Sequence, residues 1–532
     1  MSKTLVVDAG GRGHALCSHL SRSQEVKEVI WVPGNAGVSC DQTGKIRRVN
    51  FSEKKDPLDE ICEIAAREGI ELAVIGQEKY LRYGLRDRLE EVGVKTVGPK
   101  QKSTILEADK AWTKQYLKRI GVDVPEFIIF EQADEAIDWV SKWYKETSKP
   151  LAIKASGLAE GKGTRVCWNY EQARCWIETL MIGDPLTKTY QPRFGDAGKK
   201  IVVEEGLVGK DWIEIAYFAL VDEKGSALPF GTAYEDKRAF DGNEDCLKDW
   251  NLLYTLYRRW DKQKPPNYYR ILSVLRELTI NLNTGGMICI APHPLLDEKL
   301  NENIMKEFVE PVLRNCEDYG IPRFQGVLYL QLMFNIRTHE AKVLEINVRH
   351  GDIEAQVILE RLESELFPYL KACVDGNLAE MEKPNWKQEW SYGIALVSGS
   401  SQDKDLGKEI KSKAELAEDI AMEGYEAKKD WNIGYPYVHL TNQPIDGLEK
   451  IKDVKIYHNG TELINGKLLS TGGRVLTLVY TSPNFEEAKR KVDEAAESVQ
   501  FSTKRYRREP IPKDKLDVLL PKLYQFPKNT IP

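Results

Sequence analysis

The segment with the clearest chemical capability in this chain is rich in lysine and glycine. Residues 151–163 read Leu-Ala-Ile-Lys-Ala-Ser-Gly-Leu-Ala-Glu-Gly-Lys-Gly, which is not the Gly-x-x-x-x-Gly-Lys-Ser/Thr pattern of a P-loop. Glycines let backbone N–H groups approach an oxyanion closely, because they carry no Cβ and adopt positive φ at little cost. Lys154 and Lys162 add charges that suit phosphate. The segment predicts a nucleoside triphosphate site; the alternative is a flexible hairpin with solvated lysines.

A second polar group follows an apolar run near residue 345. On a strand, Glu345 and Asn347 share one face, because successive side chains alternate. A carboxylate and an amide oxygen form an oxygen-ligand pair for Mg²⁺ that bridges phosphates. Arg349 continues the alternation and suits the charge on a transferring phosphoryl group. Beside the lysine-glycine segment, this pattern favours a phosphoryl-transfer site over a solvated strand face.

Three shorter motifs each have two interpretations. The Glu-Glu-Gly-Leu run at 204–207 is a hinge that offers backbone groups to an adenine, or a plain strand end. The Gly-Gly-Arg runs at 10–12 and 472–474 are anion-binding turns or ordinary turns. His14 at a helix start is more often structural than catalytic. The sequence supports no Ser-His-Asp or Cys-His arrangement.

The first hundred residues alternate between strands and helices. Apolar strands at 3–8, 29–32 and 72–75 alternate with helical runs; one of these runs is at 57–68, and another, at 81–91, follows the third strand. This alternation is typical of a parallel, doubly wound sheet. Ligands of such sheets bind at the carboxyl ends of strands, where Gly10, Gly34 and Gly76 fall.

Composition limits the class of protein. The chain has 532 residues, 42% of them hydrophobic and 30% charged, which predicts several globular domains. A net charge of −6 argues against a nucleic-acid partner or a polybasic membrane anchor. No apolar run reaches the length of a membrane span, and no hydrophobic signal-peptide segment follows Met1. Nine scattered cysteines without a Cys-x-x-Cys pair predict reduced thiols and a cytoplasmic location.

Taken together, the ordered motifs resemble the phosphoribosylamine–glycine ligase family of the ATP-grasp superfamily. The family's Pro-Gly-Asn-Ala-Gly is intact at 33–37, its Asn-Thr-Gly-Gly-Met at 283–287 and its Glu-x-Asn-x-Arg-x-Gly-Asp at 345–352. The order and approximate spacing agree from residue 3 to about residue 508. Further matching segments lie at 10–16, 76–78, 109–114, 153–163, 472–475 and 506–508.

The resemblance implies an α/β multidomain fold. We predict an N-terminal doubly wound parallel sheet at 1–103 and an ATP-grasp α+β core at 104–375, with a lid at about 124–205. We also predict a small C-terminal α/β domain at 385–508. An aromatic and charged insertion is expected at about 239–281. Because residues 509–532 contain five prolines, we expect an extended tail there.

The resemblance also implies a reaction in purine biosynthesis. The carboxylate of glycine attacks the γ-phosphate of ATP and forms glycyl phosphate, and the amine of 5-phosphoribosylamine then displaces phosphate. The products are glycinamide ribonucleotide, ADP and phosphate. Such an enzyme must screen two anions and exclude water from a labile acyl phosphate. ATP, glycine and 5-phosphoribosylamine are the implied partners, Mg²⁺ or Mn²⁺ is the implied cofactor, and we expect a monomer or a weak homo-oligomer.

Site residues follow from the resemblance by their matching positions. For the metal these are Glu345 and Asn347, and for catalysis Arg349, Asn283 and Lys237. The predicted ATP-binding residues are Lys110, Lys154, Gly157, Gly161, Lys162, Gly163, Glu204, Glu205, Leu207 and Asp211. The predicted substrate-binding residues are Gly11, Arg12, Asn35, Glu78, Thr284, Gly285, Asp352, Gly472, Gly473 and Arg474. Residues 157–163 would form a lid that closes on ATP.

Most departures from the family pattern fall on the amino-acid and ribosyl-phosphate side. Gly13 replaces a glutamate, Gln77 a proline, Ile288 a glycine and Gln331 a glycine. ATP use is therefore better supported than the identity of the acid and the amine. Two alternatives stay open: an ATP-grasp ligase with another acid or amine, and an inactive nucleotide-binding scaffold that uses the aromatic insertion to bind a partner.

Overall fold

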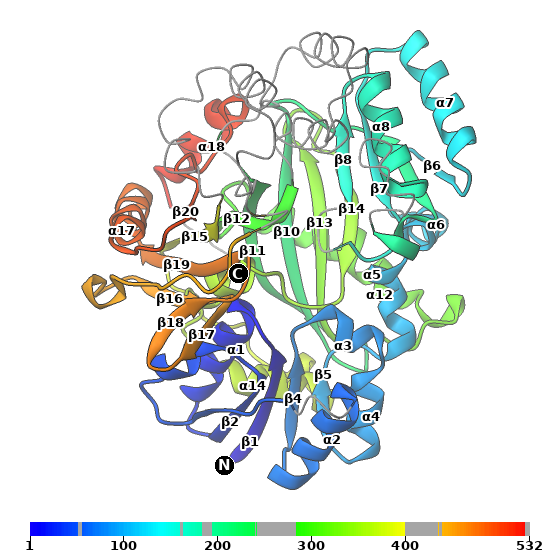
Figure 1. Ribbon diagram of the computed structural model, residues 1–532. Helices are drawn as coiled ribbons and strands as arrows, with labels where there is room; N and C mark the ends of the chain where they lie inside the picture. Colours follow the sequence, from blue (N-terminus) through cyan, green and yellow to red (C-terminus); the bar gives the residue numbers. More distant parts are fainter. Residues whose placement is uncertain are drawn as a thin grey trace.

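The computed structural model describes residues 1–51, 56–159, 163–183, 194–239, 241, 283–399, 435 and 439–526 (Figure 1). Gly161, Lys162 and nearly all of the predicted insertion at 239–281 lie outside these ranges. The predictions made for them therefore stay predictions. No helix in the described ranges combines the length and the apolar character needed to cross a lipid bilayer.

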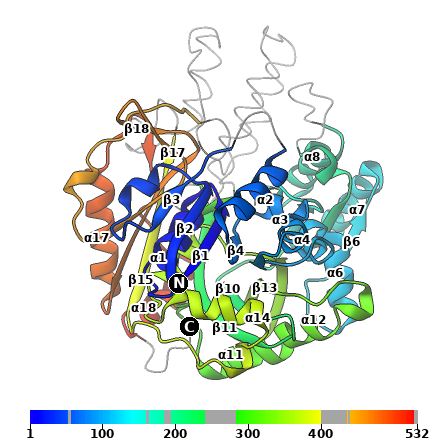
Figure 2. The same cartoon turned by 90° about the horizontal axis from the view of Figure 1, so that it is seen from below.

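The N-terminal sheet confirms the predicted doubly wound fold. Its five strands are all paired in parallel, in the order β3-β2-β1-β4-β5 (Figure 2). The strands are β1 Ser2–Asp8, β2 Val26–Pro33, β3 Ile46–Arg48, β4 Leu72–Ile75 and β5 Lys95–Val97. The helices of this region are α1 Gly11–Ser21, α2 Pro57–Glu68, α3 Glu78–Arg82 and α4 Leu85–Glu91.

Alternation along β1 assigns these helices to opposite faces of the sheet. Val6 packs in one apolar cluster with Leu16 of α1, whereas Leu5 and Val7 pack in a second cluster with Ile61 of α2. The single helix expected at 81–91 is two helices. Gly84 breaks it, because this residue adopts a φ of +78°, a conformation that a helix interior does not allow.

A nine-stranded sheet forms the centre of the molecule. Its order is β14-β13-β10-β11-β12-β15-β19-β16, and β20 also pairs with β15. The predicted core and C-terminal regions thus share one sheet, joined by antiparallel pairing of β12 with β15. The strands are β10 Trp212–Val221, β11 Ala227–Arg238, β12 Asn283–Ala291, β13 Gly326–Asn335, β14 Ala341–Asn347, β15 Trp390–Ser398, β16 Lys455–His458, β19 Arg474–Ser482 and β20 Lys504–Arg505.

A separate four-stranded antiparallel sheet lies within the predicted lid region. Its order is β6-β9-β7-β8, and α7 and α8 cover it on the outer side of the molecule (Figure 1). These elements are β6 Phe127–Phe130, α7 Ala133–Glu146, β7 Leu151–Ala155, β8 Thr164–Cys167, α8 Tyr170–Met181 and β9 Ile201–Glu205. Helices α5 Ile105–Ala108 and α6 Lys110–Arg119 precede the sheet in the chain.

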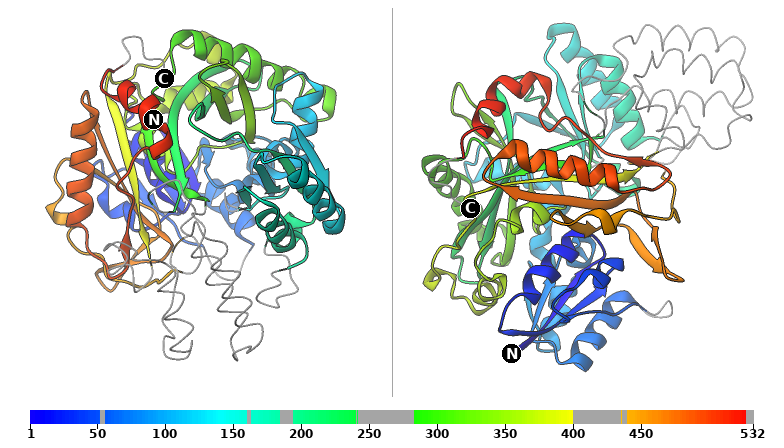
Figure 3. Two further views of the ribbon diagram at one scale, coloured as in Figure 1. Left: turned by 90° about the horizontal axis from the view of Figure 1, so that it is seen from above. Right: turned by 90° about the vertical axis from the view of Figure 1, so that its left-hand side faces the viewer.

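The remaining elements pack around the two larger sheets. Helix α17 Phe485–Ser498 lies against β15 and β19 (Figure 3). A helical run at 298–314 has a π-helical turn in its middle. The other elements are α11 Glu298–Ile304, the π-turn Met305–Val309, α12 Glu310–Arg314, α13 Glu354–Leu359, α14 Leu366–Asp375, β17 Thr461–Ile464 and β18 Lys467–Ser470.

The prediction of an extended C-terminal tail is wrong for its described part. Helix α18 spans Leu516–Leu523 and buries Leu519 and Leu523 in the main apolar cluster. Phe526 follows it and packs edge-on against Trp390, with ring centroids 5.1 Å apart. Leucines spaced three or four residues apart form one apolar stripe on a helix, and here that periodicity outweighs the proline content.

We predict that Leu519→Ala lowers the free energy of unfolding by about 2–5 kcal/mol, because it leaves a cavity in the main core. Leu519 is fully buried, whereas Tyr524 is 63% exposed one turn later. Tyr524→Ala is therefore the matched control and should leave the stability nearly unchanged. Thermal unfolding followed by circular dichroism measures both. Equal effects of the two substitutions would contradict the docking of α18.

Candidate active site

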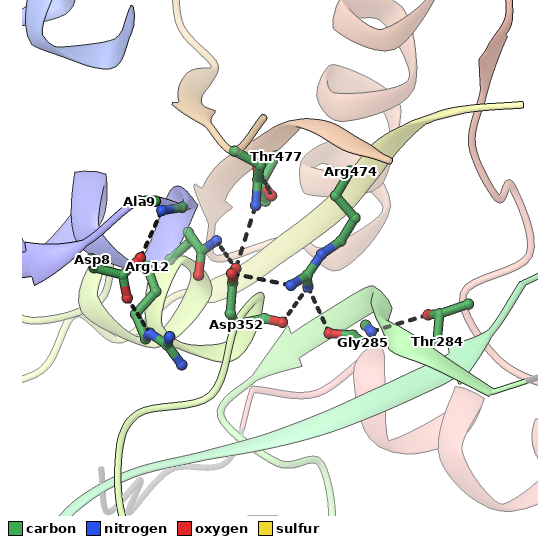
Figure 4. Close-up of polar contacts among 12 residues, drawn as sticks. Asp8, Ala9, Arg12, Thr284, Gly285, Asp352, Arg474 and Thr477 are labelled. Atoms are coloured by element: carbon green, nitrogen blue, oxygen red, sulfur yellow. Dashed lines mark hydrogen bonds and ion pairs between the residues drawn. The ribbon is translucent and has the colours of Figure 1, made fainter. Parts of the chain in front are cut away.

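An ion pair between Asp352 and Arg474 links the segment that follows β14 to the start of β19 (Figure 4). The guanidinium Nη2 of Arg474 lies 3.1 Å from Oδ2 of Asp352, and Nη1 donates to the carbonyl of Gly285 at 2.6 Å. Although burial opposes ionisation, Arg474 and Arg12 keep the pKa of Asp352 below its ordinary value. Both charges therefore persist at neutral pH in a half-buried place where three strand ends meet.

The N-terminal sheet reaches the same junction through Arg12. Its guanidinium contacts Asp8 at 2.7 Å and donates to the carbonyl of His350 at 2.9 Å. Asp8 ends β1, and its carboxylate also accepts from the backbone N–H of Gly10 at 2.6 Å. A Cβ at position 76 would lie only 2.2 Å from Oδ2 of Asp8, so glycine is required there by close packing. The carboxylate of Asp8, which binds both Gly10 and Arg12, thus holds the predicted Gly-Gly-Arg turn in place.

Asn35 connects the N-terminal sheet to the C-terminal region. Its side-chain nitrogen lies within 2.8–3.0 Å of the carbonyl oxygens of Ala9, His458 and Asn459. Its carbonyl oxygen accepts from the N–H of Gly37 at 2.8 Å. The side chain therefore acts as a cross-link in this structure, and substrate contact by Asn35 stays a prediction.

The predicted substrate-side glycines Gly11 and Gly473 also lie where neighbouring side chains approach the backbone closely. A Cβ on Gly11 would lie 2.5 Å from the amide of Gln356, and one on Gly473 would lie 2.4 Å from the ring of Tyr435. The hydroxyl of Tyr435 accepts from the N–H of Gly285 at 3.1 Å. Packing alone thus explains Gly11 and Gly473. Thr284 lies beside them, and its hydroxyl donates to the carbonyl of Lys237.

Arg349 is held by two carboxylates at the end of β14. Its Nη2 lies 2.9 Å from Glu107, and its Nε lies 3.5 Å from Glu78. Glu107 also accepts from the backbone N–H of Val348 at 2.9 Å. Burial opposes the charge, but Glu107 and Glu78 raise the pKa of Arg349. The side chain is therefore a fixed cation beside the predicted metal ligands.

On the ATP side, a single buried carboxylate is shared by two lysines. Glu204 forms ion pairs with Lys114, at 2.8 Å, and with Lys154. The same lysines donate to the carbonyls of Val343 and Leu344 at 2.9 and 3.3 Å. Strand β14 is the edge of the central sheet, so these carbonyls are open to side chains. Glu204 and Lys154 belong to the lid sheet and Lys114 to α6. The two lysines reach the central sheet through the carbonyls of β14.

Two glycines of the lysine-glycine segment are needed for packing. A Cβ on Gly157 would lie 2.6 Å from Ala197, and a Cβ on Gly163 would lie 2.6 Å from Ala159. The ammonium of Lys110 lies 3.5 Å from the carbonyl of Gly157. The described parts of the segment are thus closely packed around Gly157 and Gly163, and phosphate contact by its backbone stays a prediction.

The predicted adenine hinge leads from the lid to the central sheet. Glu205 accepts from the ammonium of Lys342 at 2.5 Å, and Asp211 pairs with Arg337 at 2.9 Å. Leu207 lies between them and is half-buried. No contact in the structure assigns adenine to these residues, so this role also stays a prediction.

Lys237 lies within a group of carboxylates near the predicted metal ligands. Its ammonium lies 3.3 Å from Glu235, 3.8 Å from Glu214 and 3.9 Å from Glu345. Burial opposes the charge, but these carboxylates raise the pKa of Lys237. Glu345 is half-buried, and although burial opposes its ionisation, Lys237, Lys110 and Lys154 lower its pKa to about 2. Glu345 is therefore an anion at all physiological pH values.

The donor set fits a cation that is bound jointly with phosphates. Glu345 and Asn347 supply a carboxylate and an amide oxygen from one face of β14. Within the described ranges, no group of three or more His, Cys, Asp or Glu side chains is arranged to hold a metal ion. Two protein oxygens are what Mg²⁺ uses when substrate phosphates and water complete its octahedron.

Sequence reasoning missed four site residues: Lys114, Glu107, Glu214 and Glu235. Lys114 could have been found, because it is four residues from Lys110 and thus on the same face of α6. Glu107 precedes that helix without any motif, and Glu214 meets Lys237 only through the pairing of β10 with β11. Glu235 could have been found, because it lies two residues before Lys237 on β11, and alternation places both side chains on one face.

The central sheet, the separate lid sheet and the cations around Glu345 define an ATP-grasp protein. Residues 108–355 match the family model of the phosphoribosylglycinamide synthetase ATP-grasp (A) domain. Residues 2–107 match the N domain of the same family, and residues 432–509 match its C domain. The chain belongs to the phosphoribosylglycinamide synthetase family.

Individual relatives agree along nearly the whole chain. The phosphoribosylamine–glycine ligase of Archaeoglobus fulgidus is 39% identical over 514 residues, which cover 95% of this chain and 98% of the relative. The ligase of the same name from Xanthomonas axonopodis pv. citri is 30% identical over 94% of this chain and 95% of its own. A crystal structure of phosphoribosylamine–glycine ligase from Thermotoga maritima has the same fold, with a TM-score of 0.65 and 24% identity. That match covers 95% of this chain and 99% of the other.

We predict that Glu204→Gln destabilises the protein by about 3–5 kcal/mol, because it leaves two buried lysines without their shared counter-charge. Glu205→Gln is the matched control. Its half-buried pair with Lys342 should contribute about 1 kcal/mol or less. Unfolding should be measured at pH 7, below the pKa of about 8 to which burial lowers Lys114. A similar loss of stability in Glu204→Gln and Glu205→Gln would contradict a larger contribution of the buried Glu204 ion pairs to folding.

The same cluster predicts a pH dependence. Burial opposes ionisation of Glu204, but Lys114 and Lys154 lower its pKa below the ordinary value of 4.5. A lowered carboxyl pKa stabilises the folded state above the unfolded value, and this contribution is lost as the pH falls toward the folded value. Wild-type stability should therefore fall below about pH 4.5 more steeply than that of Glu204→Gln.

Proposed function

We propose that this chain joins glycine to 5-phosphoribosylamine at the expense of ATP, and so makes glycinamide ribonucleotide. The proposal is carried by the cations around Glu345: Lys237 lies 3.9 Å from its carboxylate, and Lys110, Lys154 and Arg349 help to lower its pKa. Such a set of fixed cations suits the charge that develops on a transferring phosphoryl group. The names of the relatives support the choice of acid and amine.

The reaction has two steps. A carboxylate oxygen of glycine attacks the γ-phosphorus of ATP, and the bond to the bridging oxygen breaks, which releases ADP and leaves glycyl phosphate. The amine of 5-phosphoribosylamine then attacks the carbonyl carbon, loses a proton and expels phosphate. A divalent cation, Mg²⁺ or Mn²⁺, would screen the phosphates when bound to Glu345 and Asn347.

The chain's own residues would perform the positioning. Lys110, Lys154 and Lys162 would bind the phosphates, and Lys154 would exchange its ion pair with Glu204 for a phosphate oxygen. Arg349, held by Glu107 and Glu78, would stabilise the transferred phosphoryl group. Fixed groups of this kind need no reorganisation during the reaction, which is why they lower its barrier.

The junction around Asp352 is proposed as the side that receives glycine and 5-phosphoribosylamine. It brings the N-terminal turn, the start of β12 and the Gly-Gly-Arg turn before β19 to one place (Figure 4). The residues proposed to line it are Gly11, Arg12, Asn35, Glu78, Asn283, Thr284, Gly285, Asp352, Gly472, Gly473 and Arg474. The same proposal includes a cytoplasmic location and a monomeric or weakly associating state, supported by the net charge of −6 and the scattered cysteines.

We predict that the purified chain releases ADP from ATP with Mg²⁺, 5-phosphoribosylamine and glycine, measured against a panel of other amino acids. Glu345→Ala should lower kcat/KM by about 100-fold or more, because it removes a charged contact to the cation. Glu340→Ala, in the exposed turn before β14, is the control and should keep wild-type turnover.

Each other outcome of this panel identifies an alternative. Turnover with a different amino acid alone would replace glycine as the substrate. An absence of ADP release with every pair of substrates would favour a nucleotide-binding scaffold. Unchanged turnover in Glu345→Ala would remove the metal assignment while leaving the ligase activity in place.

A further inference from the structure

Gln331 occupies the centre of the face on which the proposed metal ligands lie. It is buried on β13, opposite Glu345 of β14 on one side and opposite Ala216 of β10 on the other. Directly opposed residues of antiparallel strands share a face, so these side chains point the same way. The small Ala216 leaves space beside the glutamine.

Both ends of the Gln331 amide are used. Its oxygen accepts from the ammonium of Lys237 at 2.5 Å, and its nitrogen donates to the carboxylate of Glu214. The amide therefore links a lysine to a carboxylate and leaves neither of its own polar groups unsatisfied. A glycine, which the family pattern has at this position, could form neither bond.

Lys237 has to cross the sheet to reach this amide. In the order β14-β13-β10-β11, it starts three strands away from Glu345, which is roughly 14 Å of sheet. The two long side chains nevertheless approach to 3.9 Å, above Gln331. Without the amide, the ammonium of Lys237 could shift from Glu235 and Glu214 toward Glu345, because only these three carboxylates would then remain as its partners.

We infer that Gln331 is a positioning residue that holds the ammonium of Lys237 away from Glu345 and so keeps this carboxylate available to a divalent cation. The hydrogen bond to Glu214 fixes the amide, and the amide fixes the lysine. This inference rests on the proposed function for the role of Glu345 as a metal ligand. It goes beyond that function by assigning a task to a residue at which this chain departs from the family pattern.

The test measures Mn²⁺ binding to the intact chain with saturating ADP, by the loss of the free-ion signal in electron paramagnetic resonance. Gln331→Met keeps the volume and removes both hydrogen bonds, and we expect it to weaken Mn²⁺ binding by about 10-fold. Gln331→Asn keeps an amide that is too short to bridge both partners, so a smaller loss is expected. ADP affinity without metal should stay at the wild-type value.

Two further variants identify the route of the effect. Gln325→Met is the matched control, because Gln325 is equally buried just before β13 but donates to the distant carbonyl of Cys373. It should bind Mn²⁺ like the wild type. In a Lys237→Met background, Gln331→Met should cause no additional loss, because the competing ammonium is gone.

The possible contrary results are distinguishable. Wild-type Mn²⁺ affinity in Gln331→Met and Gln331→Asn would overturn the inference and leave the proposed ligase function intact. An equal loss with and without Lys237 would also overturn it, since Gln331 would then act by another route. No Mn²⁺ binding in the wild type would overturn both the inference and the metal assignment, whereas missing turnover with glycine would affect the proposed function alone.

Discussion

The contact between Arg474 and Asp352 is the interaction on which the proposed active site depends. Arg474 begins a strand of the C-terminal region, whereas Asp352 follows the edge strand β14, and the same guanidinium also binds the carbonyl of Gly285. Arg12 connects the N-terminal sheet to the same segment, because its guanidinium donates to the carbonyl of His350, two residues before Asp352. Removing an ion pair from water is costly unless both partners are satisfied, so this half-buried pair helps to hold these elements in one relative arrangement. The junction therefore fixes the distances between groups that come from distant parts of the chain.

Charge pairing explains how so many buried cations coexist before a polyanion binds. Lys114 and Lys154 share Glu204, Arg349 is held by Glu107 and Glu78, and Lys237 lies among three carboxylates. Each pair satisfies a group whose isolation would cost several kcal/mol. ATP phosphates could replace Glu204 at Lys154 with little reorganisation, because they carry the same sign of charge. We therefore propose that the folded site is stable without nucleotide and complementary to its phosphates.

The sequence predicts the local parts of this arrangement and misses the non-local ones. Alternating strands and helices predicted the parallel N-terminal sheet, and the i, i+2 spacing predicted that Glu345 and Asn347 share a face of β14. Glu107 and Glu214 were missed, because packing and strand pairing bring them to the site and no motif marks them. Glu235 could have been found by the same i, i+2 spacing, because it lies two residues before Lys237 on β11. Gly157 and Gly163 were attributed to phosphate binding alone, but each also meets a packing constraint that only the folded lid reveals. The helix α18 was missed because proline content was given more weight than leucine spacing.

Transfer of an oxygen atom from glycine to phosphate tests the central claim most directly. The claim is that this site activates the carboxylate of glycine by phosphorylation. Glycine labelled with ¹⁸O in its carboxylate should be incubated with ATP, Mg²⁺ and 5-phosphoribosylamine, and the released phosphate analysed by mass spectrometry. The account predicts that each phosphate released in the ligation carries one labelled oxygen. Phosphate that carries only unlabelled oxygen, with ADP still formed, would contradict an acyl phosphate intermediate at this site.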